Sequence, residues 1–326
     1  MEKRTGTDSE KVIFIFSSPR SGSTWLGKIF DASPDVFYLH EPDQIDRGVD
    51  LLPYWFESRL DPQLLPNARL YLQRLLSIRA AHATGTHPFF KKSFRSCAAG
   101  IWRRGLIYAD KGIGHIGFHR MADRMPIPNL NSPGYRFVPV IKSVGALGRA
   151  AMLIEAGRPN LHPVLLVRHP CACIASIRQA RRLRFFETPS NFGKLLETKA
   201  AMDHEVTESM INQADEIEKQ AWHWLLANSE AFRSVTAIEG MVINFDEFVV
   251  DAGKQIKDIF AWCALEWHND VDEFIDYSHR HSRGYYSVFR YPDRALNAWR
   301  RELSAPEIST IRDIVVRDPV GRMFFS

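Results

Sequence analysis

The stretch VIFIFSSPRSGSTWLGKIF, residues 12–30, joins an apolar segment to a loop of small residues and then to a second apolar segment. Residues 12–16 contain only Val, Ile and Phe, which is typical of a short buried strand. The loop begins at Ser17. Pro19 fixes one backbone dihedral in it, and Gly22 lets the backbone approach a ligand closely. The pattern predicts a strand, a tight loop and a helix.

The start of this helix is expected near Trp25, with Ser23 or Thr24 as the capping residue. Backbone N–H groups, loop hydroxyls and the guanidinium of Arg20 would then converge at the N-terminus of the helix. Such a set of donors favours a dianionic phosphate or sulfate. The stretch is therefore predicted to bind an anion.

The loop differs from the nucleoside triphosphate loop GxxxxGK[ST], in which Lys reaches the terminal phosphates and the last hydroxyl binds magnesium. It has a single Gly, no Lys before Ser23, and Arg20 two residues ahead of the Gly. A P-loop nucleotide phosphotransferase is therefore a less favoured interpretation. An ordinary strand-to-helix turn with capping hydroxyls is the other alternative.

A second segment with the same organisation is LLVRHPCACIASIR, residues 165–178. Residues 163–167 predict a strand, Arg168 follows at its end, and Pro170 begins a helix that carries Ser176. Two such segments in one chain are a more specific signal than either alone.

These two segments resemble the cofactor-binding motifs of sulfotransferases that use 3′-phosphoadenosine-5′-phosphosulfate (PAPS). The Arg20 form of the loop and the later FYLHEPD, residues 37–43, resemble the carbohydrate branch of that family and its bacterial relatives. The resemblance implies that the first motif binds the 5′-phosphosulfate and that Arg168 and Ser176 bind the 3′-phosphate. The residues implied in the first motif are Arg20, Ser21, Gly22, Ser23, Thr24 and Trp25.

The resemblance also implies an α/β fold with three layers, in which helices flank a central, mainly parallel sheet of P-loop-like type. We expect a single sulfotransferase domain over residues 1–326, with residues 1–11 as a flexible tail. A chain of 326 residues with 45% hydrophobic residues suits one large α/β domain.

The candidate general base is Glu41, which follows a short predicted strand, residues 36–39. Ligand-facing groups lie beyond the strand ends of an open parallel sheet, and the resemblance to FYLxEP segments of carbohydrate sulfotransferases favours Glu41. His40 is the second choice, because neighbours along a strand point in opposite directions. A surface Glu held by Pro42 is the alternative without a function.

Lys142 lies at the end of another predicted strand, residues 135–141. Pro139 is unfavourable inside a central strand, because it lacks a backbone N–H. The resemblance implies that this Lys reaches the reacting centre. A solvated Lys at a strand end is the alternative.

Further basic residues occur in three places. Arg283 and Arg290 lie in a predicted loop, residues 281–293, which resembles the cofactor-covering loop of the family, and they are alternatives for one phosphate contact. The segments KKSFR, residues 91–95, and WRR, residues 102–104, fall in the region where the family has variable acceptor contacts. They could meet an acidic acceptor or form a solvated face.

Two further patterns match motifs of other protein classes only in part. GIGHIG, residues 112–117, matches the dinucleotide motif GxGxxG, but no strong strand precedes it and prolines follow it, so a nicotinamide site is disfavoured. His115 and His119 have the spacing of a metal pair but lack the intervening Glu of HExxH. The four cysteines have neither a disulfide nor a zinc pattern, and no metal site is predicted.

The net charge of +4 suits an anionic ligand but is too small to indicate nucleic-acid binding. No apolar run approaches the 18 or so residues of a membrane span, and the first residues are polar, so we expect a cytoplasmic protein. Golgi relatives carry an N-terminal anchor. Its absence is expected of a bacterial-type enzyme or a truncated form.

The favoured function is transfer of the sulfuryl group of PAPS to a hydroxyl of a carbohydrate, lipid or other small molecule, with 3′,5′-ADP as product. Glu41 would accept the hydroxyl proton, while Arg20 and Lys142 would hold the sulfuryl group and stabilise the departing phosphate. No metal is needed, because the protein supplies the cations. A protein that binds PAPS or 3′,5′-ADP without turnover is the remaining alternative. The sequence does not indicate the acceptor or the oligomeric state.

Overall fold

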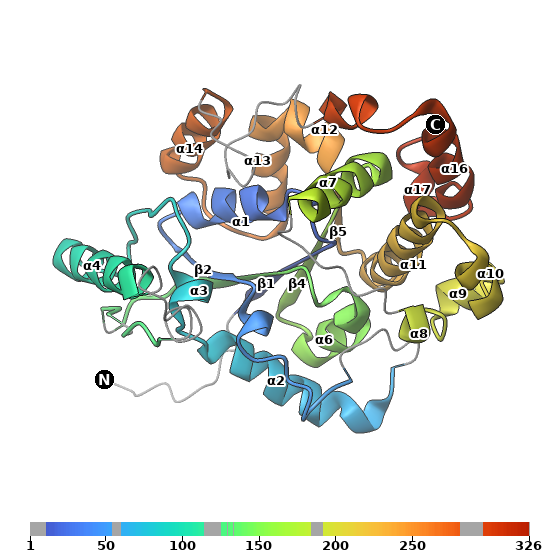
Figure 1. Ribbon diagram of the computed structural model, residues 1–326. Helices are drawn as coiled ribbons and strands as arrows, with labels where there is room; N and C mark the ends of the chain where they lie inside the picture. Colours follow the sequence, from blue (N-terminus) through green and yellow to red (C-terminus); the bar gives the residue numbers. More distant parts are fainter. Residues whose placement is uncertain are drawn as a thin grey trace.

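The computed structural model describes residues 11–53, 60–113, 125–128, 130–132, 134–183, 192–280 and 296–325. A five-stranded sheet with the order β2-β3-β1-β4-β5 lies at its centre, and every neighbouring pair of strands is parallel (Figure 1). The strands are β1 (Val12–Ser17), β2 (Val36–His40), β3 (Val138–Ser143), β4 (Leu161–Val167) and β5 (Met241–Asn244).

The parallel arrangement brings the carboxyl ends of all five strands to one edge of the sheet. In the register of the sheet, His40 lies beside Lys142, and Ser17 lies beside Leu166. The residues that follow β1, β2 and β4 therefore meet at this edge, where open α/β sheets bind their ligands.

Strand β3 differs from its predicted range, because it begins at Val138 and continues to Ser143. Lys142 thus lies inside the strand rather than just beyond it. Pro139 is tolerated near the start of β3, where it is paired with β2, and pairing with β1 begins only at Val140.

Helices cover both faces of the sheet, which confirms the predicted three-layer α/β class (Figure 1). Successive side chains of β1 enter different cores: Ile13 and Ile15 pack in one cluster, and Phe14 and Phe16 pack in the other. The first cluster is completed by α1 (Ser23–Ala32), α12 (Phe245–Val250), α13 (Ala252–Trp262) and α14 (Asn269–Arg280).

The second cluster contains the longer helices α2 (Leu65–Ser77), α6 (Ala150–Gly157), α7 (Pro170–Arg182), α11 (Glu216–Thr236) and α16 (Ala305–Val315). Beyond the β2 edge of the sheet lies α4 (Cys97–Ile113) (Figure 1). The shorter elements are α3 (Ala81–Thr84), α8 (Phe192–Leu195), α9 (Lys199–Asp203), α10 (Glu208–Gln213), α17 (Pro319–Arg322), η1 (Pro42–Gln44), η2 (Pro62–Leu64), η4 (Leu147–Arg149) and η5 (Ala298–Arg301).

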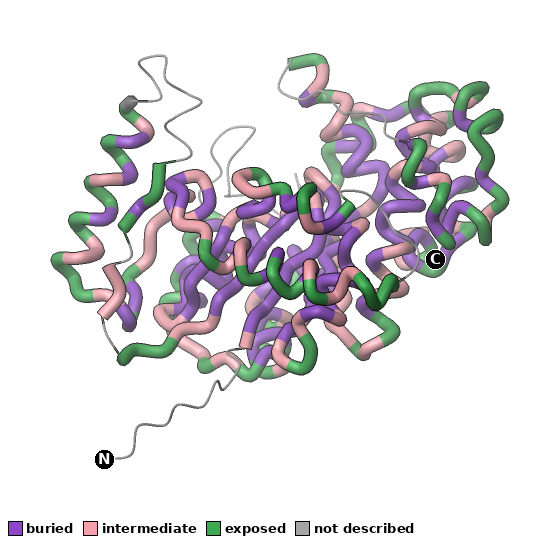
Figure 2. The backbone as a smooth tube through the Cα atoms, turned by 90° about the horizontal axis from the view of Figure 1, so that it is seen from below, coloured by how far each residue is buried: buried purple, intermediate pink, exposed green. Residues whose placement is uncertain are grey.

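Buried residues follow the sheet through the middle of the molecule, and exposed residues gather on the outer helices (Figure 2). No helix among the described residues has both the length and the apolar character needed to cross a bilayer.

Gly22, at the junction of the loop and α1, provides a test of this packing. Its φ of 91° is in the left-handed region, and a Cβ atom there would lie 2.2 Å from Cε2 of Phe245. We expect Gly22→Ala to lower the free energy of unfolding by more than the roughly 1–3 kcal/mol of backbone strain alone, as measured by urea unfolding.

Gly105→Ala is the matched control, because Gly105 lies within α4 and a Cβ there would meet nothing within 4 Å. This change should stabilise the helix by up to about 1 kcal/mol. Equal effects of the two substitutions would contradict the close packing of Gly22 against Phe245.

Candidate active site

The loop after β1 leads into α1 earlier than predicted. The helix begins at Ser23 rather than near Trp25, and its N-cap is Gly22, with no side-chain capping hydrogen bond. The prediction that Ser23 or Thr24 caps the helix is therefore wrong, because the left-handed turn at Gly22 already places both residues in the first turn. The N-terminus of α1 is left without a side-chain cap.

In the described residues, buried serine hydroxyls at the end of β1 and in the loop lack a hydrogen-bond partner, among them those of Ser17 and Ser21. The Oγ atoms of Ser17 and Ser21 are buried and accept or donate no hydrogen bond within the described part of the chain. Buried polar groups usually have a partner. These two hydroxyls fit an anionic group bound at the N-terminus of α1.

The second motif lies directly against this loop. Arg20 donates from Nε to Oγ of Ser176 at 2.9 Å, and Arg168 donates from Nη1 to the backbone carbonyl of Arg20 at 2.8 Å. Residues separated by about 150 positions thus form one cationic surface at the carboxyl edge of β1 and β4. The φ of Arg20 is 68°, a left-handed conformation that is uncommon outside glycine.

Trp25 lies in the core beside this surface. Its indole is 2% exposed and donates from Nε1 to Oγ of Ser278 at 2.9 Å. Its ring contacts those of Phe248 and His279. The side chain therefore joins the start of α1 to α12 and α14, and a contact with a cofactor stays a prediction.

Glu41 and Lys142 are in direct contact at the same edge. Lys142, which is 1% exposed, donates to Oε1 of Glu41, and Gln44 donates to Oε2. The backbone N–H of Glu41 also donates to the carbonyl of Lys142 at 2.7 Å. The carboxylate is thus oriented by β3 and by η1.

His40 lies closer to Glu41 than predicted. Its Nε2 is 3.9 Å from Oε1 of Glu41, because Glu41 leaves the strand with a left-handed φ of 47° and its side chain no longer follows the strand alternation. Burial, together with the nearby Lys142 and His82, holds the pKa of His40 well below its usual range. The imidazole is therefore neutral at physiological pH, and its Nδ1 lies 3.0 Å from the hydroxyl of Tyr38.

Asp43 is a second carboxylate at this edge that sequence reasoning missed, although it belongs to the quoted FYLHEPD segment. Its Oδ2 accepts a hydrogen bond from Oγ of Ser143 at 2.7 Å, and its Oδ1 is buried without a partner among the described residues. Burial, opposed by the hydrogen bond from Ser143 and aided by the charge of Glu41, raises the pKa of Asp43 to about 6. Asp43 therefore titrates close to neutral pH.

A cavity of about 1200 Å³ opens beside the loop and Gln44, which is a hydrogen-bond partner of Glu41. Ser18, Pro19 and Gln44 line its end at the sheet edge, and α7, α8, α10 and α11 form the other walls. The segments suggested for acceptor contacts, residues 91–95 and 102–104, do not line this cavity.

Several predicted sites lie elsewhere. Arg283, Arg290, His115 and His119 lie outside the described residues, as does most of the GIGHIG segment. In the part of the chain that the structure describes, one group could hold a metal ion, namely Asp35, Glu266 and His268. Asp35 precedes β2, so this group lies at the opposite edge of the sheet from Glu41, about 20 Å away along the strand.

The raised pKa of Asp43 predicts a pH-dependent stability. The folded protein keeps the Asp43 proton up to about pH 6, whereas the unfolded chain loses it near pH 3.8, so stability falls as the pH rises through this interval. Relative to Asp43→Asn, the wild type should lose on the order of 1–3 kcal/mol of unfolding free energy between pH 4 and pH 7. Urea unfolding of both proteins at several pH values measures this difference. A constant difference would show that Asp43 titrates normally.

The chain is similar to known proteins of one family. A family model described as the sulfotransferase family matches residues 12–269. Over 39 residues, the chain is 41% identical to carbohydrate sulfotransferase 2 of Mus musculus, and this match covers 12% of the chain and 7% of that protein.

Solved structures that resemble the chain include three described as sulfotransferases. The sulfotransferase domain of the Synechococcus PCC 7002 olefin synthase is 16% identical, with a TM-score of 0.40 and coverage of 94% of this chain and 96% of that one. The sulfotransferase domain from the curacin biosynthetic pathway is 14% identical, with a TM-score of 0.44 and coverage of 94% and 97%. Sulfotransferase STF9 from Mycobacterium avium is 13% identical, with a TM-score of 0.44 and coverage of 94% and 76%.

The family model extends over most of the chain and includes the loop after β1, Glu41, Lys142, and the Arg168 and Ser176 pair. The chain therefore belongs to the sulfotransferase family.

Proposed function

We propose that the protein transfers the sulfuryl group of PAPS to an acceptor hydroxyl and releases 3′,5′-ADP. The observation that carries the proposal is the contact between the two anion-binding motifs, in which Arg168 donates to the carbonyl of Arg20 and Arg20 donates to Ser176. A nucleotide with one phosphate at the 3′ position and another at the 5′ position of its ribose would contact both motifs together.

The chain has suitable hydrogen-bond donors for both the 5′-phosphosulfate and the 3′-phosphate of PAPS. The buried hydroxyls of Ser17 and Ser21 and the uncapped N-terminus of α1 suit the 5′-phosphosulfate. Arg168 and Ser176 suit the 3′-phosphate. Arg20, a residue of the loop, is hydrogen-bonded to both of them. When bound, PAPS supplies the activated sulfuryl group.

Glu41 is the proposed general base. It is ionisable, lies at the same carboxyl edge of the sheet as the loop, and is held in place by Lys142 and Gln44. As the acceptor hydroxyl attacks, Glu41 takes its proton. Lys142 and Arg20 provide the positive charge that stabilises the oxygens of the transferring group and the departing phosphate, since an arginine stays protonated at neutral pH.

The acceptor would enter through the cavity beside Gln44. Apolar side chains, among them Ile174, Ile177 and Trp224, form much of its wall. The amide oxygens of Gln220 and Asn228, on one side of α11, are buried there without a hydrogen-bond partner among the described residues. These features favour a carbohydrate, lipid or other small molecule that presents O–H or N–H donors.

Arg168→Ala tests the cofactor assignment. The change removes a charge-assisted contact worth roughly 1.5–3 kcal/mol, so the affinity for 3′,5′-ADP should fall at least tenfold in titration calorimetry. Arg182→Ala is the control, because this exposed residue of α7 pairs with Glu302 and should bind the nucleotide like the wild type. Equal affinity of Arg168→Ala and the wild type would refute the assignment of the second motif.

Glu41→Gln tests the chemistry. The substitution keeps the shape and removes the base, so single-turnover transfer from PAPS should fall about a hundredfold to ten-thousandfold. Affinity for 3′,5′-ADP should stay within about threefold, because the phosphates contact other residues.

The control for Glu41→Gln addresses Lys142, which loses its carboxylate partner in the variant. Glu41→Gln combined with Lys142→Met removes this unpaired charge. Because Lys142 is itself a proposed catalytic residue, the double variant is compared by thermal unfolding alone, which should return toward that of the wild type. Normal transfer by Glu41→Gln would assign the base to another group.

A further inference from the structure

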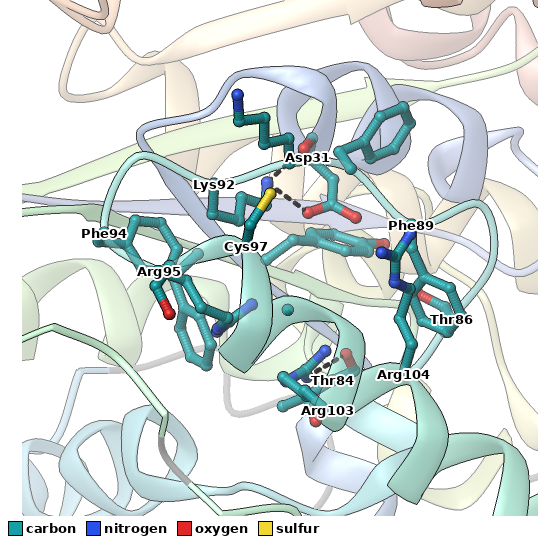
Figure 3. A pocket seen from close by; sticks show the side chains of 16 residues that line it. Asp31, Thr84, Thr86, Phe89, Lys92, Phe94, Arg95, Cys97, Arg103 and Arg104 are labelled. Carbon is teal, nitrogen blue, oxygen red and sulfur yellow. Dashed lines mark hydrogen bonds and ion pairs between the residues drawn. The ribbon is translucent and has the colours of Figure 1, made fainter.

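A second, smaller cavity lies at the other end of α1 from the anion-binding loop. It has a volume of about 230 Å³ and lies between the last turn of α1, β2 and the start of α4 (Figure 3). Asp31, which lines it, is eight residues along α1 from Ser23, so the two ends are about 12 Å apart.

The lining of this cavity carries an excess of positive charge. Asp31 is the sole acidic side chain among the described lining residues, and it already accepts from Lys28 at 2.7 Å and from Lys92 at 2.8 Å. The basic lining residues are Lys91, Lys92, Arg95, Arg103 and Arg104. They include the two charged segments that the sequence suggested for an acidic acceptor.

Arg103 is the most unusual of these cations. Its side chain is 8% exposed and donates to the backbone carbonyl of Thr84, and in the described structure no carboxylate lies within 4.0 Å of its guanidinium. Burial, with repulsion from Arg95, lowers the pKa of Arg103 to about 10. The group still carries its charge at neutral pH, and Asp31, which attracts it, already pairs with Lys28 and Lys92, so among the described residues the buried cation has no anion in direct contact.

Arg95 and the start of α4 complete the lining. Nη2 of Arg95 donates to Asn131 at 2.9 Å, whereas its Nε is buried with no acceptor in the described residues. Ser96, Cys97 and Gly100 bring the positive end of a 17-residue helix to the cavity. A Cβ atom on Gly100 would meet nothing within 4 Å, so the space in front of this turn is open.

We propose that this cavity binds one compact oxyanion of the sulfate or phosphate class, as a free ion or as an ester group of a larger molecule. The anion would pair with Arg103 and Arg95 at the N-terminus of α4. The volume is too small for a nucleotide but sufficient for a tetrahedral oxyanion. Phe89, Phe90 and Phe94 also line the cavity, and their apolar surface strengthens an ionic contact by limiting water.

The test is titration calorimetry of inorganic sulfate, and then phosphate, into the protein saturated with 3′,5′-ADP at constant ionic strength. The nucleotide fills the phosphate positions of the cofactor loop but leaves the sulfuryl position open, so the dependence of sulfate binding on residues of the second cavity identifies the site. We expect one sulfate per chain. Arg103→Gln, which removes the buried charge, should weaken the binding at least tenfold.

A second variant keeps every charge and fills the space. Gly100→Leu places a side chain in the open region and should also weaken sulfate binding at least tenfold. Gly105→Leu, on the same helix away from the cavity, and Arg69→Gln, an exposed residue of α2, should leave it within about twofold of the wild type.

Sulfate esters separate the two sources of the anion. If methyl sulfate and glucose 6-sulfate compete with inorganic sulfate, the cavity binds an ester group; if neither competes, it binds the free ion. No sulfate binding by the nucleotide-saturated protein, or binding that both Arg103→Gln and Gly100→Leu leave unchanged, would overturn the proposal.

The outcome is independent of the proposed activity. If 3′,5′-ADP does not bind, the same titration is made without it, and Arg168→Ala then separates sulfate in the loop from sulfate beside α4. Only binding that depends on Arg103 and Gly100 belongs to the second cavity.

Discussion

The hydrogen bond from Arg168 to the backbone carbonyl of Arg20 holds the two halves of the anion site together. It requires β1 and β4 to be adjacent and parallel, and it requires Arg20 to adopt a left-handed backbone conformation. That conformation costs about 1–3 kcal/mol, yet it turns the carbonyl toward Arg168 while the side chain reaches Ser176. The strain is located where the two motifs meet, which is typical of residues that serve a site.

The contact between Glu41 and Lys142 depends on the same sheet in a different way. His40 and Lys142 are register partners, so the backbone places the ammonium beside the first residue after β2. A buried ion pair contributes little net stability, because removing both charges from water costs about as much as their attraction returns. Its position at the carboxyl edge of the sheet, where α/β folds bind ligands, therefore fits a chemical role better than a structural one.

The sequence predicted the sheet class through its resemblance to the two motifs of the family, and it placed Glu41 at the ligand-facing edge because this residue follows an apolar strand. Its errors were local. The Ser-Thr pair predicted a cap, but the backbone turns at Gly22 against Phe245. Strand alternation predicted that His40 points away from Glu41, but the left-handed φ of Glu41 ends the alternation. The pKa of Asp43 depends on burial by distant segments, and much of the large cavity is formed by α8, α10 and α11, which carry no motif, so neither could be predicted.

Helix α1 organises positive charge at both of its ends, for different physical reasons. At its N-terminus the uncapped N–H groups themselves attract an anion. At its carboxyl end the dipole is negative, and Lys92 donates to the carbonyls of Asp31 and Ser33, while Lys28 donates to the carboxylate of Asp31. The helix and Asp31 thus account for both lysines. Asp31 also attracts Arg95 and Arg103, but in the described structure no carboxylate lies within 4.0 Å of either guanidinium. The charge of these two arginines therefore requires a separate explanation, and the cavity that both of them line is where an anion would supply it.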